Sequence, residues 1–442
     1  MTYTMPLSVP RRHPRRGGFV AALVVCALAS GCSTGSVSNP QPAPGDGSST
    51  AAASAGASGA ATGGATSSSP APEVALTPNV SPDTPVAVDT VVSVSATHGS
   101  VTDVVLDYTD PKLGKVKVEG ELAPDGSTWK ARSLLEPATT YSMTMTGQNI
   151  DGASQTRTTT FTTVKLSKKQ EINATLIANG STVGIAMPVV VRFSAPVTDR
   201  ASFEKRMTVT SVPSQPGSWA WVSNSEIHYR PASFWAPGTT VAVDIDINGV
   251  SAGNGSFGQK SVKGGFTVGY AFVMKADLAA HQMTVVKDGK VIRTIPISGG
   301  RPGMETRSGT KVIIEKNAEV IMDAATTGVP VDSPGYYRTN VKWAMRETWS
   351  GEYVHAAPWA DASHGKANVS HGCIGMTTAN AKWLFDLAKV GDPVVVTGTG
   401  RPLDRGNGWT DWNISFEEFR KGSALATSTA PATAGATPTK TA

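Results

Sequence analysis

Short runs in which apolar and polar residues alternate constrain the fold of this chain more than any other feature. One series of such runs lies between about residues 73 and 165, and a second lies between about residues 166 and 267. A period of two places successive side chains on opposite faces of a strand, and turn sequences such as Pro-Asp-Gly at 124–126 separate the runs. The sequence therefore predicts a predominantly all-β chain with short antiparallel strands.

An internal repeat divides this β-rich part into two similar units. Residues 137–143 (Pro-Ala-Thr-Thr-Tyr-Ser-Met) align with residues 237–243 (Pro-Gly-Thr-Thr-Val-Ala-Val) at an offset of 100 residues. This offset is typical of one immunoglobulin-like β-sandwich, so we predict two in tandem, at 73–165 and 166–268. Core packing is the preferred interpretation of the aromatic residues in the second unit, and a sugar-binding platform is the alternative. They include Trp219, Trp221 and Trp235.

A third domain is predicted from residue 269 to residue 398. Residues 281–296 have the alternation of a β-hairpin with an Asp-Gly turn. The apolar spacing of residues 377–390 instead predicts a helix, with a Thr at its N-cap and a Gly after its end. A small C-terminal extension is predicted at 399–423.

The termini have the composition of export and linker segments. Within residues 1–32, four arginines precede an apolar run and a small-residue site, as in an export signal peptide. The sequence before Cys32 approximates a lipobox, so we expect a lipid anchor on Cys32, with an ordinary signal peptide as the alternative. Residues 33–72 and 424–442 are rich in Ser, Ala, Gly, Thr and Pro, which predicts a disordered tether and a disordered tail.

The net charge argues against a nucleic-acid partner. The whole chain has a formal charge of +5, but residues 1–32 contain four arginines and neither a lysine nor an acidic residue. Removal of this segment leaves a charge near +1, which is not the strongly basic balance of a nucleic-acid-binding protein.

Cys373 is predicted to be an unpaired, functional thiol. Of the three cysteines, Cys26 lies in the apolar part of the export signal and Cys32 at its end. A free thiol in an exported protein favours a nucleophile over a buried structural cysteine. His355 precedes Cys373 by 18 residues, and the predicted helix begins just after Cys373. A nearby base and a helix N-terminus both favour the thiolate.

The sequence Ser-His-Gly-Cys-Ile-Gly at 370–375, together with His355, resembles the signature of the L,D-transpeptidases, the YkuD-type family of peptidoglycan enzymes. Gly375 stands where the family usually has Asn. One mycobacterial type shares this Gly and a Pro/Thr/Ala-rich tail, and the chain looks most like that type. The resemblance covers about residues 73–420. It implies a β-rich catalytic domain with short helices, on which the C-terminal extension packs.

The resemblance also implies a reaction and its partners. Cys373 would attack the amide between diaminopimelate and D-Ala of a tetrapeptide stem, and His355 would act as the general base. The resulting thioester would pass to a diaminopimelate amine of a second stem, giving a 3→3 cross-link. Carbapenems are the expected inhibitors, and no cofactor or metal is implied. A lipid anchor would hold the enzyme at the outer face of the plasma membrane, from which it would reach into the cell wall.

Further site residues follow from the same resemblance. The carbonyl of Ala356 would orient His355, and the amides of residues 371–373 with the Tyr337 hydroxyl would stabilise the oxyanion. The expected substrate-binding residues are Tyr337, Ser350, Gly351, Gly375, Met322 and Trp359, and the expected loop or oxyanion supports are His371, Gly372, Ser370 and Ala356.

Three positions of the motif region carry separate expectations. A catalytic role and a structural role are both open for His371. His364 is expected to be exposed to solvent. Gly375 lacks the hydrogen bonds that an Asn side chain would make, so slow acylation is expected, with Gly375→Asn raising its rate.

Other classes of function are weighed against this one. A zinc site would use His355, His364, His371 and Cys373, but their spacing matches no standard zinc motif. Papain-like enzymes and cell-wall endopeptidases have Cys before His, and sortases lack the His-Gly-Cys triplet. A cell-wall cysteine peptidase or an L,D-carboxypeptidase would use the same nucleophile. A non-catalytic wall-binding spacer protein leaves the lone thiol unexplained.

Overall fold

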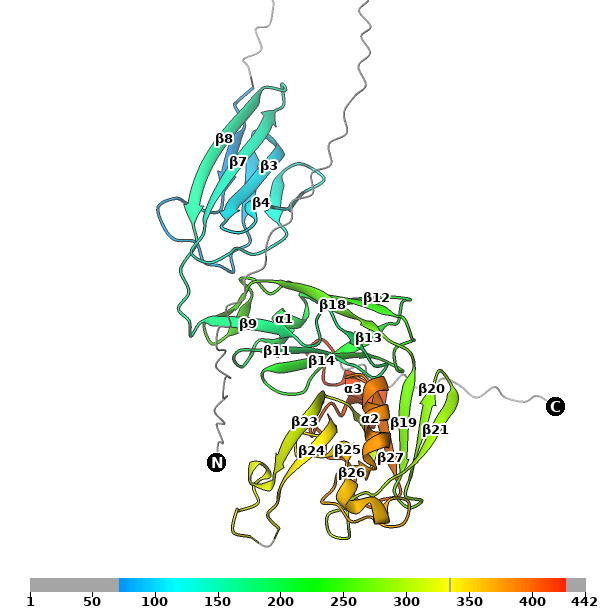
Figure 1. Cartoon of the computed structure of the whole chain (residues 1–442). Coiled ribbons are helices and arrows are strands. Elements are labelled where there is room, and N and C mark those ends of the chain that lie inside the picture. The colour runs from blue at the N-terminus through cyan, green and yellow to red at the C-terminus, as the bar shows by residue number, and fades with distance from the viewer. Residues whose placement is uncertain (1–70, 334, 427–442) are drawn as a thin grey trace, which may run out of the picture. The chain divides into compact units, whose positions relative to one another are not determined.

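Strands are the main regular structure in the part of the chain that the computed structural model describes, namely residues 71–333 and 335–426 (Figure 1). Within these ranges the strands pair into six sheets, which occur in chain order as three pairs. The predominantly all-β fold predicted from the alternation is confirmed. The predicted export signal, Cys32, nearly all of the tether and most of the tail lie outside the described residues. No helix in the described ranges is long and apolar enough to cross a membrane.

The first pair of sheets forms an immunoglobulin-like sandwich around its own apolar core. Tyr141 stacks on Phe161 with 5.3 Å between ring centroids. Its hydroxyl accepts a hydrogen bond from the Glu136 N–H at 2.7 Å, which satisfies the polar end of a buried ring. One sheet has the order β1 (Ala75–Pro78), β2 (Ser93–Thr97), β6 (Thr128–Ala131), β5 (Gly120–Leu122), and the other β4 (Gly114–Val118), β3 (Gly99–Asp110), β7 (Thr140–Asn149), β8 (Ser154–Thr162).

The second pair of sheets repeats this plan. β15 begins at Thr240, 100 residues after β7 begins at Thr140, as the internal repeat predicts. One sheet has the order β10 (Thr182–Val183), β18 (Val262–Val268), β15 (Thr240–Ile245), β12 (Met207–Val212), and the other β13 (Gly217–Trp221), β14 (Glu226–Pro231), β11 (Val189–Phe193), β9 (Glu171–Leu176), β17 (Ser256–Gln259), β16 (Ser251–Gly253). Helix α1 (Arg200–Glu204) precedes β12.

The tryptophans of the second sandwich belong to its core. Trp219, Trp221 and Trp235 are all buried in one apolar cluster. Each indole N–H donates a hydrogen bond inside the protein, to Met207 O, Glu204 Oε2 and Met187 O respectively. The core interpretation is confirmed, and these rings do not form a sugar-binding platform.

The third pair of sheets carries His355 and the strand that follows Cys373. The expected hairpin is formed by β20 and β21, and its turn residues Asp288 and Gly289 both have positive φ angles, as a two-residue turn of this type requires. One sheet has the order β21 (Lys290–Pro296), β20 (Gln282–Lys287), β19 (Phe272–Asp277), β27 (Pro393–Thr397), β22 (Gly309–Val312), and the other β23 (Glu315–Asp323), β24 (Arg338–Arg346), β25 (Tyr353–Ala356), β26 (Ile374–Met376). The 3-10 helices η1 (Ala324–Thr327) and η2 (Pro358–Ser363) lie in its loops.

Helix α2 (Thr378–Leu387) is the helix that the sequence predicts after the cysteine motif. Its N-cap is Thr377, whose hydroxyl accepts a hydrogen bond from the Asn380 N–H at 3.3 Å. Ala381 and Leu384 are fully buried in the same apolar core as Ile374 of β26. The helix therefore fixes the strand that directly follows Cys373.

The C-terminal extension packs on the catalytic domain, as the resemblance implied, and also on the second sandwich. It contains η3 (Asp411–Asn413) and α3 (Phe416–Arg420). On the catalytic domain, Asp404 pairs with Arg307, and the Asn413 side chain bonds to the backbone of Thr310. The Trp412 indole N–H donates to Ala186 O at 2.8 Å, and the Arg230 guanidinium lies 4.6 Å from the Trp412 ring centroid. The buried imidazole of His228 contacts Glu226 at 2.8 Å and Asp411 at 2.9 Å.

Candidate active site

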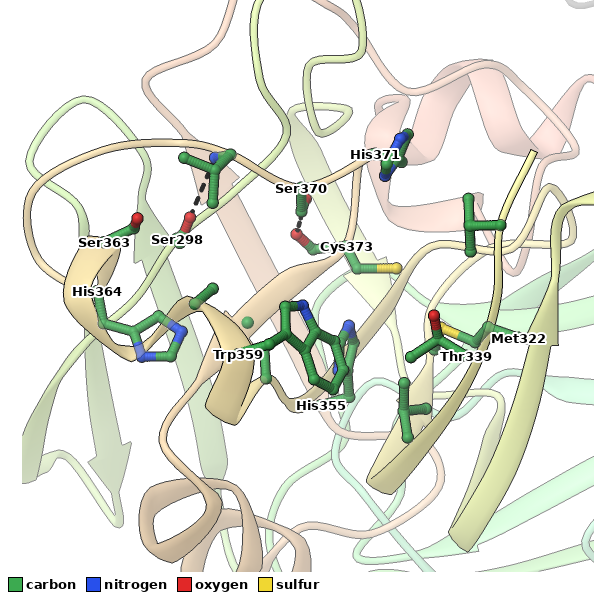
Figure 2. A pocket seen from close by; sticks show the side chains of 16 residues that line it. Ser298, Met322, Thr339, His355, Trp359, Ser363, His364, Ser370, His371 and Cys373 are labelled. Atoms are coloured by element: carbon green, nitrogen blue, oxygen red, sulfur yellow. Dashed lines mark hydrogen bonds between the residues drawn. The ribbon is translucent and has the colours of Figure 1, made fainter. Parts of the chain in front are cut away.

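A cavity of about 360 Å³ is lined by residues of the β23–β24–β25–β26 sheet and of the loops next to it. It opens beside β25 and β26, which pair in parallel and so bring residues 355 and 375 next to each other. Figure 2 shows Cys373, His355, Trp359 and Met322 around the same space. The predicted residues that line it are Cys373, His355, Met322, Tyr337, Trp359, Ser370, His371 and Gly375.

Cys373 is a buried free thiol in the loop before β26. Its Sγ lies 3.7 Å from the Gly351 carbonyl, to which the thiol donates a weak hydrogen bond. Burial raises the pKa of Cys373 to about 12, although the Tyr353 backbone N–H favours the thiolate. The nucleophile is therefore a neutral thiol in the free protein. Within the described residues no hydrogen bond joins Sγ to α2, because β26 separates them.

His355 is placed to accept the thiol proton. Its Nδ1 donates to the Ala356 carbonyl at 2.8 Å, the contact that the resemblance implied, so Nε2 is the unprotonated nitrogen. Burial lowers the pKa of His355, which keeps the ring neutral at neutral pH. The Trp359 ring stacks on it at 6.0 Å between centroids. In the described ranges no hydrogen bond joins His355 to Cys373, a separation that is common before substrate closes a site.

Hydrogen bonds shape the loop before Cys373. The Ser370 hydroxyl donates to the Cys373 carbonyl at 2.6 Å and accepts from the Gly372 N–H at 3.1 Å. Gly372 has a φ of +124°, which favours glycine. The Gly372 amide is thus occupied inside the loop. The expected oxyanion role of residues 371–373 therefore falls on the amides of His371 and Cys373, and that role stays a prediction.

His371 and Tyr337 form the rim of the cavity. Their rings lie 4.8 Å apart with a tilt of 31°. Burial raises the pKa of Tyr337, with a further contribution from the nearby Cys373, so its hydroxyl remains a hydrogen-bond donor. The His371 ring thus packs against the Tyr337 ring, and its catalytic and structural roles both stay predictions.

His364 is buried, and the expectation that it is exposed is wrong. Its relative exposure is 7%. It follows η2 and lines the cavity together with Gly375. No local pattern indicates this burial, because the neighbours Ser363 and Gly365 are typical of a surface turn. A turn buries a side chain only when another part of the fold covers it.

Gly375 lies in a space that has little room for a side chain. Its N–H donates to Ser298 O at 2.8 Å, and its carbonyl accepts from the Ser298 N–H at 3.0 Å. A Cβ atom added at 375 would lie 2.9 Å from the Ala357 Cβ and 3.6 Å from the His364 Nε2. The first distance is shorter than real Cβ contacts, and Ala357 has no flexible side chain that could move away.

This crowding changes the expected effect of Gly375→Asn. The single substitution is expected to lower the acylation rate and the thermal midpoint, since forced overpacking costs about 1–3 kcal/mol. Ala357→Gly combined with Gly375→Asn removes the clash and is expected to recover most of both losses. Acylation is followed by intact mass and unfolding by calorimetry. A faster rate in the single variant would show that the strand moves to admit the side chain.

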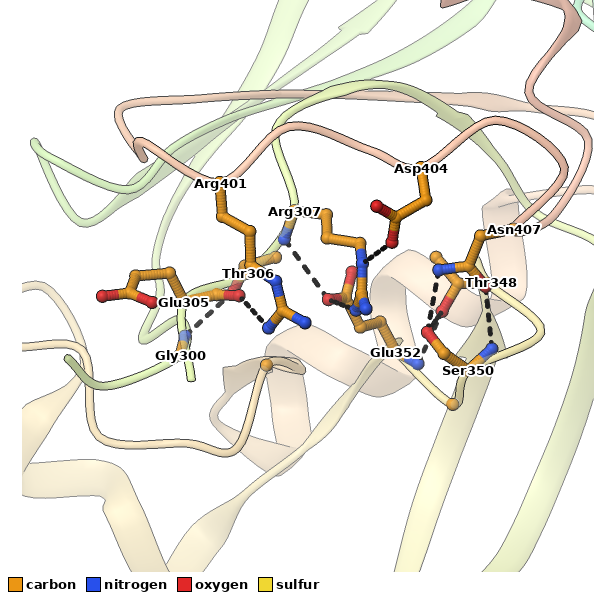
Figure 3. Close-up of polar contacts among 12 residues, drawn as sticks. Gly300, Glu305, Thr306, Arg307, Thr348, Ser350, Glu352, Arg401, Asp404 and Asn407 are labelled. Atoms are coloured by element: carbon orange, nitrogen blue, oxygen red, sulfur yellow. Dashed lines mark hydrogen bonds and ion pairs between the residues drawn. The ribbon is translucent and has the colours of Figure 1, made fainter. Parts of the chain in front are cut away.

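A network of polar side chains holds residues 347–352, the loop whose Gly351 carbonyl contacts the sulfur of Cys373 (Figure 3). Lys311 is fully buried, with its Nζ 2.6 Å from Glu352 Oε2 and 3.1 Å from Glu347 Oε2. Arg307 contacts Glu352 at 2.9 Å and Asp404 of the C-terminal extension at 2.8 Å. We did not predict these groups. The one available signal was a lysine within the apolar run of residues 310–314.

Two predicted substrate-binding residues belong to this loop and do not line the cavity. The Ser350 N–H and hydroxyl both bond to the Asn407 side chain at 2.9 Å. The Gly351 carbonyl faces the sulfur of Cys373. Gly351 thus contacts the nucleophile directly, and Ser350 holds the loop that carries Gly351. Of the described residues, no group of three or more His, Cys, Asp or Glu side chains is arranged to hold a metal ion.

Comparison with known proteins agrees with this geometry. Residues 83–251 match the bacterial Ig domain model, and residues 271–396 match the L,D-transpeptidase catalytic domain (YkuD) model. L,D-transpeptidase 2 of Mycobacterium tuberculosis is 36% identical over 344 residues, which cover 77% of this chain and 82% of that protein. L,D-transpeptidase 1 of the same species is 40% identical over 221 residues, which cover 50% of this chain and 82% of that protein.

A solved structure of the L,D-transpeptidase LdtMt1 in complex with imipenem is 39% identical, with a TM-score of 0.45, and covers 50% of this chain and 96% of that one. The identity to L,D-transpeptidase 2 extends through most of both sequences. It is accompanied by a match to the catalytic domain model over the residues that contain Cys373 and His355. The chain belongs to the L,D-transpeptidase family.

Proposed function

We propose that this protein forms 3→3 cross-links between peptidoglycan stem peptides through a thioester on Cys373. The observation that carries this proposal is the pairing of a buried thiol with a neutral imidazole in one cavity, where Nδ1 of His355 is held by the Ala356 carbonyl. This arrangement leaves Nε2 free to accept a proton. It is the arrangement that acyl transfer by a cysteine requires.

The first half of the reaction acylates the enzyme. The Cys373 thiol gives its proton to His355 Nε2 as Sγ attacks the carbonyl between diaminopimelate and D-Ala. The tetrahedral oxyanion is stabilised by donors at the cavity rim, for which the Tyr337 hydroxyl is a candidate. The C–N bond then breaks, D-Ala takes the proton from His355, and a thioester remains on Cys373.

The second half transfers the acyl group. A diaminopimelate amine of a second stem gives a proton to His355 as it attacks the thioester carbonyl. The C–S bond breaks, the sulfur of Cys373 recovers the proton, and the new amide joins the two stems. Because the resting thiol has a raised pKa, proton transfer has to accompany attack rather than precede it.

The test is mass spectrometry of the products formed from purified protein and a disaccharide tetrapeptide. A dimer that has lost one D-Ala and carries a diaminopimelate-to-diaminopimelate amide supports the proposal. A tripeptide monomer as the main product would instead show L,D-carboxypeptidase activity. If neither product forms with the folded wild-type protein, the proposal is wrong.

We also propose that the protein is exported and lipid-anchored through Cys32. The support is the arrangement of arginines, apolar run and small residues before Cys32. Cys32→Ala is expected to move most of the protein from the membrane fraction to the soluble fraction of the producing cells, as measured by immunoblot. An unchanged membrane fraction would favour an ordinary signal peptide or another mode of attachment.

A further inference from the structure

His364 presents a buried imidazole to the active-site cavity without a hydrogen bond on either ring nitrogen. Its side chain is 2% exposed, and neither Nδ1 nor Nε2 has a hydrogen-bond partner among the described residues. The nearest charged atom is Asp361 Oδ1, 3.3 Å from Nδ1 but not aligned for a hydrogen bond. Buried polar groups nearly always find partners, so this ring requires an explanation.

The protonation state of His364 follows from its surroundings. Burial lowers the pKa of His364, and the Asp361 carboxylate only partly offsets this. The ring is therefore neutral at neutral pH. The carboxylate beside Nδ1 favours the proton on that nitrogen, which leaves Nε2 as a hydrogen-bond acceptor.

Nε2 faces the space above Gly375. The position that a Cβ would take at 375 is 3.6 Å from Nε2 and 3.8 Å from the Ser298 carbonyl oxygen. Figure 2 shows the His364 ring on the side of Ser298, with the Trp359 ring beside His355. Two acceptors thus border this part of the cavity, close to the strand that begins after Cys373.

We propose that His364 is a specificity-determining residue, whose Nε2 accepts a hydrogen bond from an N–H group of the bound donor stem peptide. The inference rests on the proposed function and adds to it the chemistry of one subsite. A substrate group with N–H donors would form a hydrogen bond to the unpaired Nε2. A substrate carboxylate at this position would instead face two hydrogen-bond acceptors, Nε2 and the Ser298 carbonyl, so its binding is disfavoured. Gly375 places no side chain between Nε2 and the cavity, and because Nε2 is buried in the free protein, the bound peptide would reach it only with a local shift of the surrounding side chains.

Three variants test this role. His364→Leu removes the acceptor at similar volume, His364→Gln keeps a polar amide near Nε2, and Lys366→Ala is an exposed control on the same loop. Acylation by the tetrapeptide donor is measured as kcat/KM. The rate at which iodoacetamide alkylates Cys373 is also measured for each variant. The change in kcat/KM is divided by the change in this alkylation rate, which separates an effect on substrate from an effect on the reactivity of the thiol. Thermal midpoints report the fold.

We expect kcat/KM of His364→Leu to fall about tenfold, the effect of one hydrogen bond, while its thermal midpoint holds or rises because an unpaired buried group is lost. His364→Gln is expected to recover about half of the loss on a logarithmic scale, and Lys366→Ala to match wild type. If His364 only supports the fold, stability and kcat/KM of His364→Leu will fall together.

Equal kcat/KM for His364→Leu and wild type would overturn the inference and would leave the proposed function standing. Absence of any acylated product with the wild-type protein would overturn the proposed function itself. The two failures are therefore distinguishable.

Discussion

Cys373→Ala is expected to abolish cross-linking, with a loss of at least about 10³-fold in the rate, because the variant lacks the atom that forms the thioester. The fold should survive. Cys373 packs beside Met322, Val341 and Ala344, and replacing a buried thiol by a methyl group removes a single atom from this cluster. The measurements are product formation by mass spectrometry and the thermal midpoint.

A carbapenem provides an independent readout of the same variant. A thiolate can open the strained lactam, and the acyl group remains on sulfur as a thioester. Intact mass should show one drug-sized adduct on wild type and none on Cys373→Ala, while penicillins should react poorly, as the family resemblance implies. An adduct that persists on Cys373→Ala would place the reactive nucleophile elsewhere.

Lys311→Met is expected to destabilise the catalytic domain by about 3–5 kcal/mol, the usual effect of removing one partner from a buried ion pair. Lys311 is fully buried between Glu347 and Glu352. The two carboxylates hold the pKa of Lys311 above its ordinary value although burial acts in the opposite direction. Without this ammonium group, two buried carboxylates repel each other beneath the loop that carries Gly351.

Hydrogen exchange measured by mass spectrometry locates this effect. Peptides from β22 and from residues 347–352 should lose protection in Lys311→Met, and carbapenem acylation of Cys373 should slow. Lys263→Met is the matched control, because Lys263 pairs with Asp244 at an exposed position of the second sandwich, where ion pairs contribute little. Equal protection in both variants would show that the buried network does not support the loop.

Local patterns predicted the parts of the structure that depend on neighbouring residues. The Asp288-Gly289 turn defines the hairpin, and the Thr377 N-cap defines the start of α2. His355 and Cys373 lie close together because His355 is in β25 and Cys373 directly precedes β26, and these two strands pair in parallel. The motif that contains both residues predicted this proximity. These features need only short stretches of sequence to form.

Features that depend on distant segments were missed. His364 is buried because η2 folds over the cavity, which no property of residues 361–365 indicates. Lys311 acquires its partners from a loop about 40 residues further along the chain, and the contact of Asp411 with His228 spans 183 residues. Single-sequence periodicity carries no information on such pairs. The two opposite expectations for Gly375→Asn differ for the same reason, because the sequence does not give the position of Ala357, whose Cβ would lie 2.9 Å from a Cβ at 375.

The packing of the C-terminal extension on the second sandwich has a consequence for the order of events during synthesis. A ribosome releases the second sandwich long before the extension, and domains generally fold in that order. Until Asp411, Trp412 and Phe419 emerge, His228 lacks its Asp411 carboxylate and Arg230 lacks the aromatic rings that cover its guanidinium. A nascent chain therefore exposes part of this face throughout translation of the catalytic domain, and it covers the face only after residues 411–419 have been made.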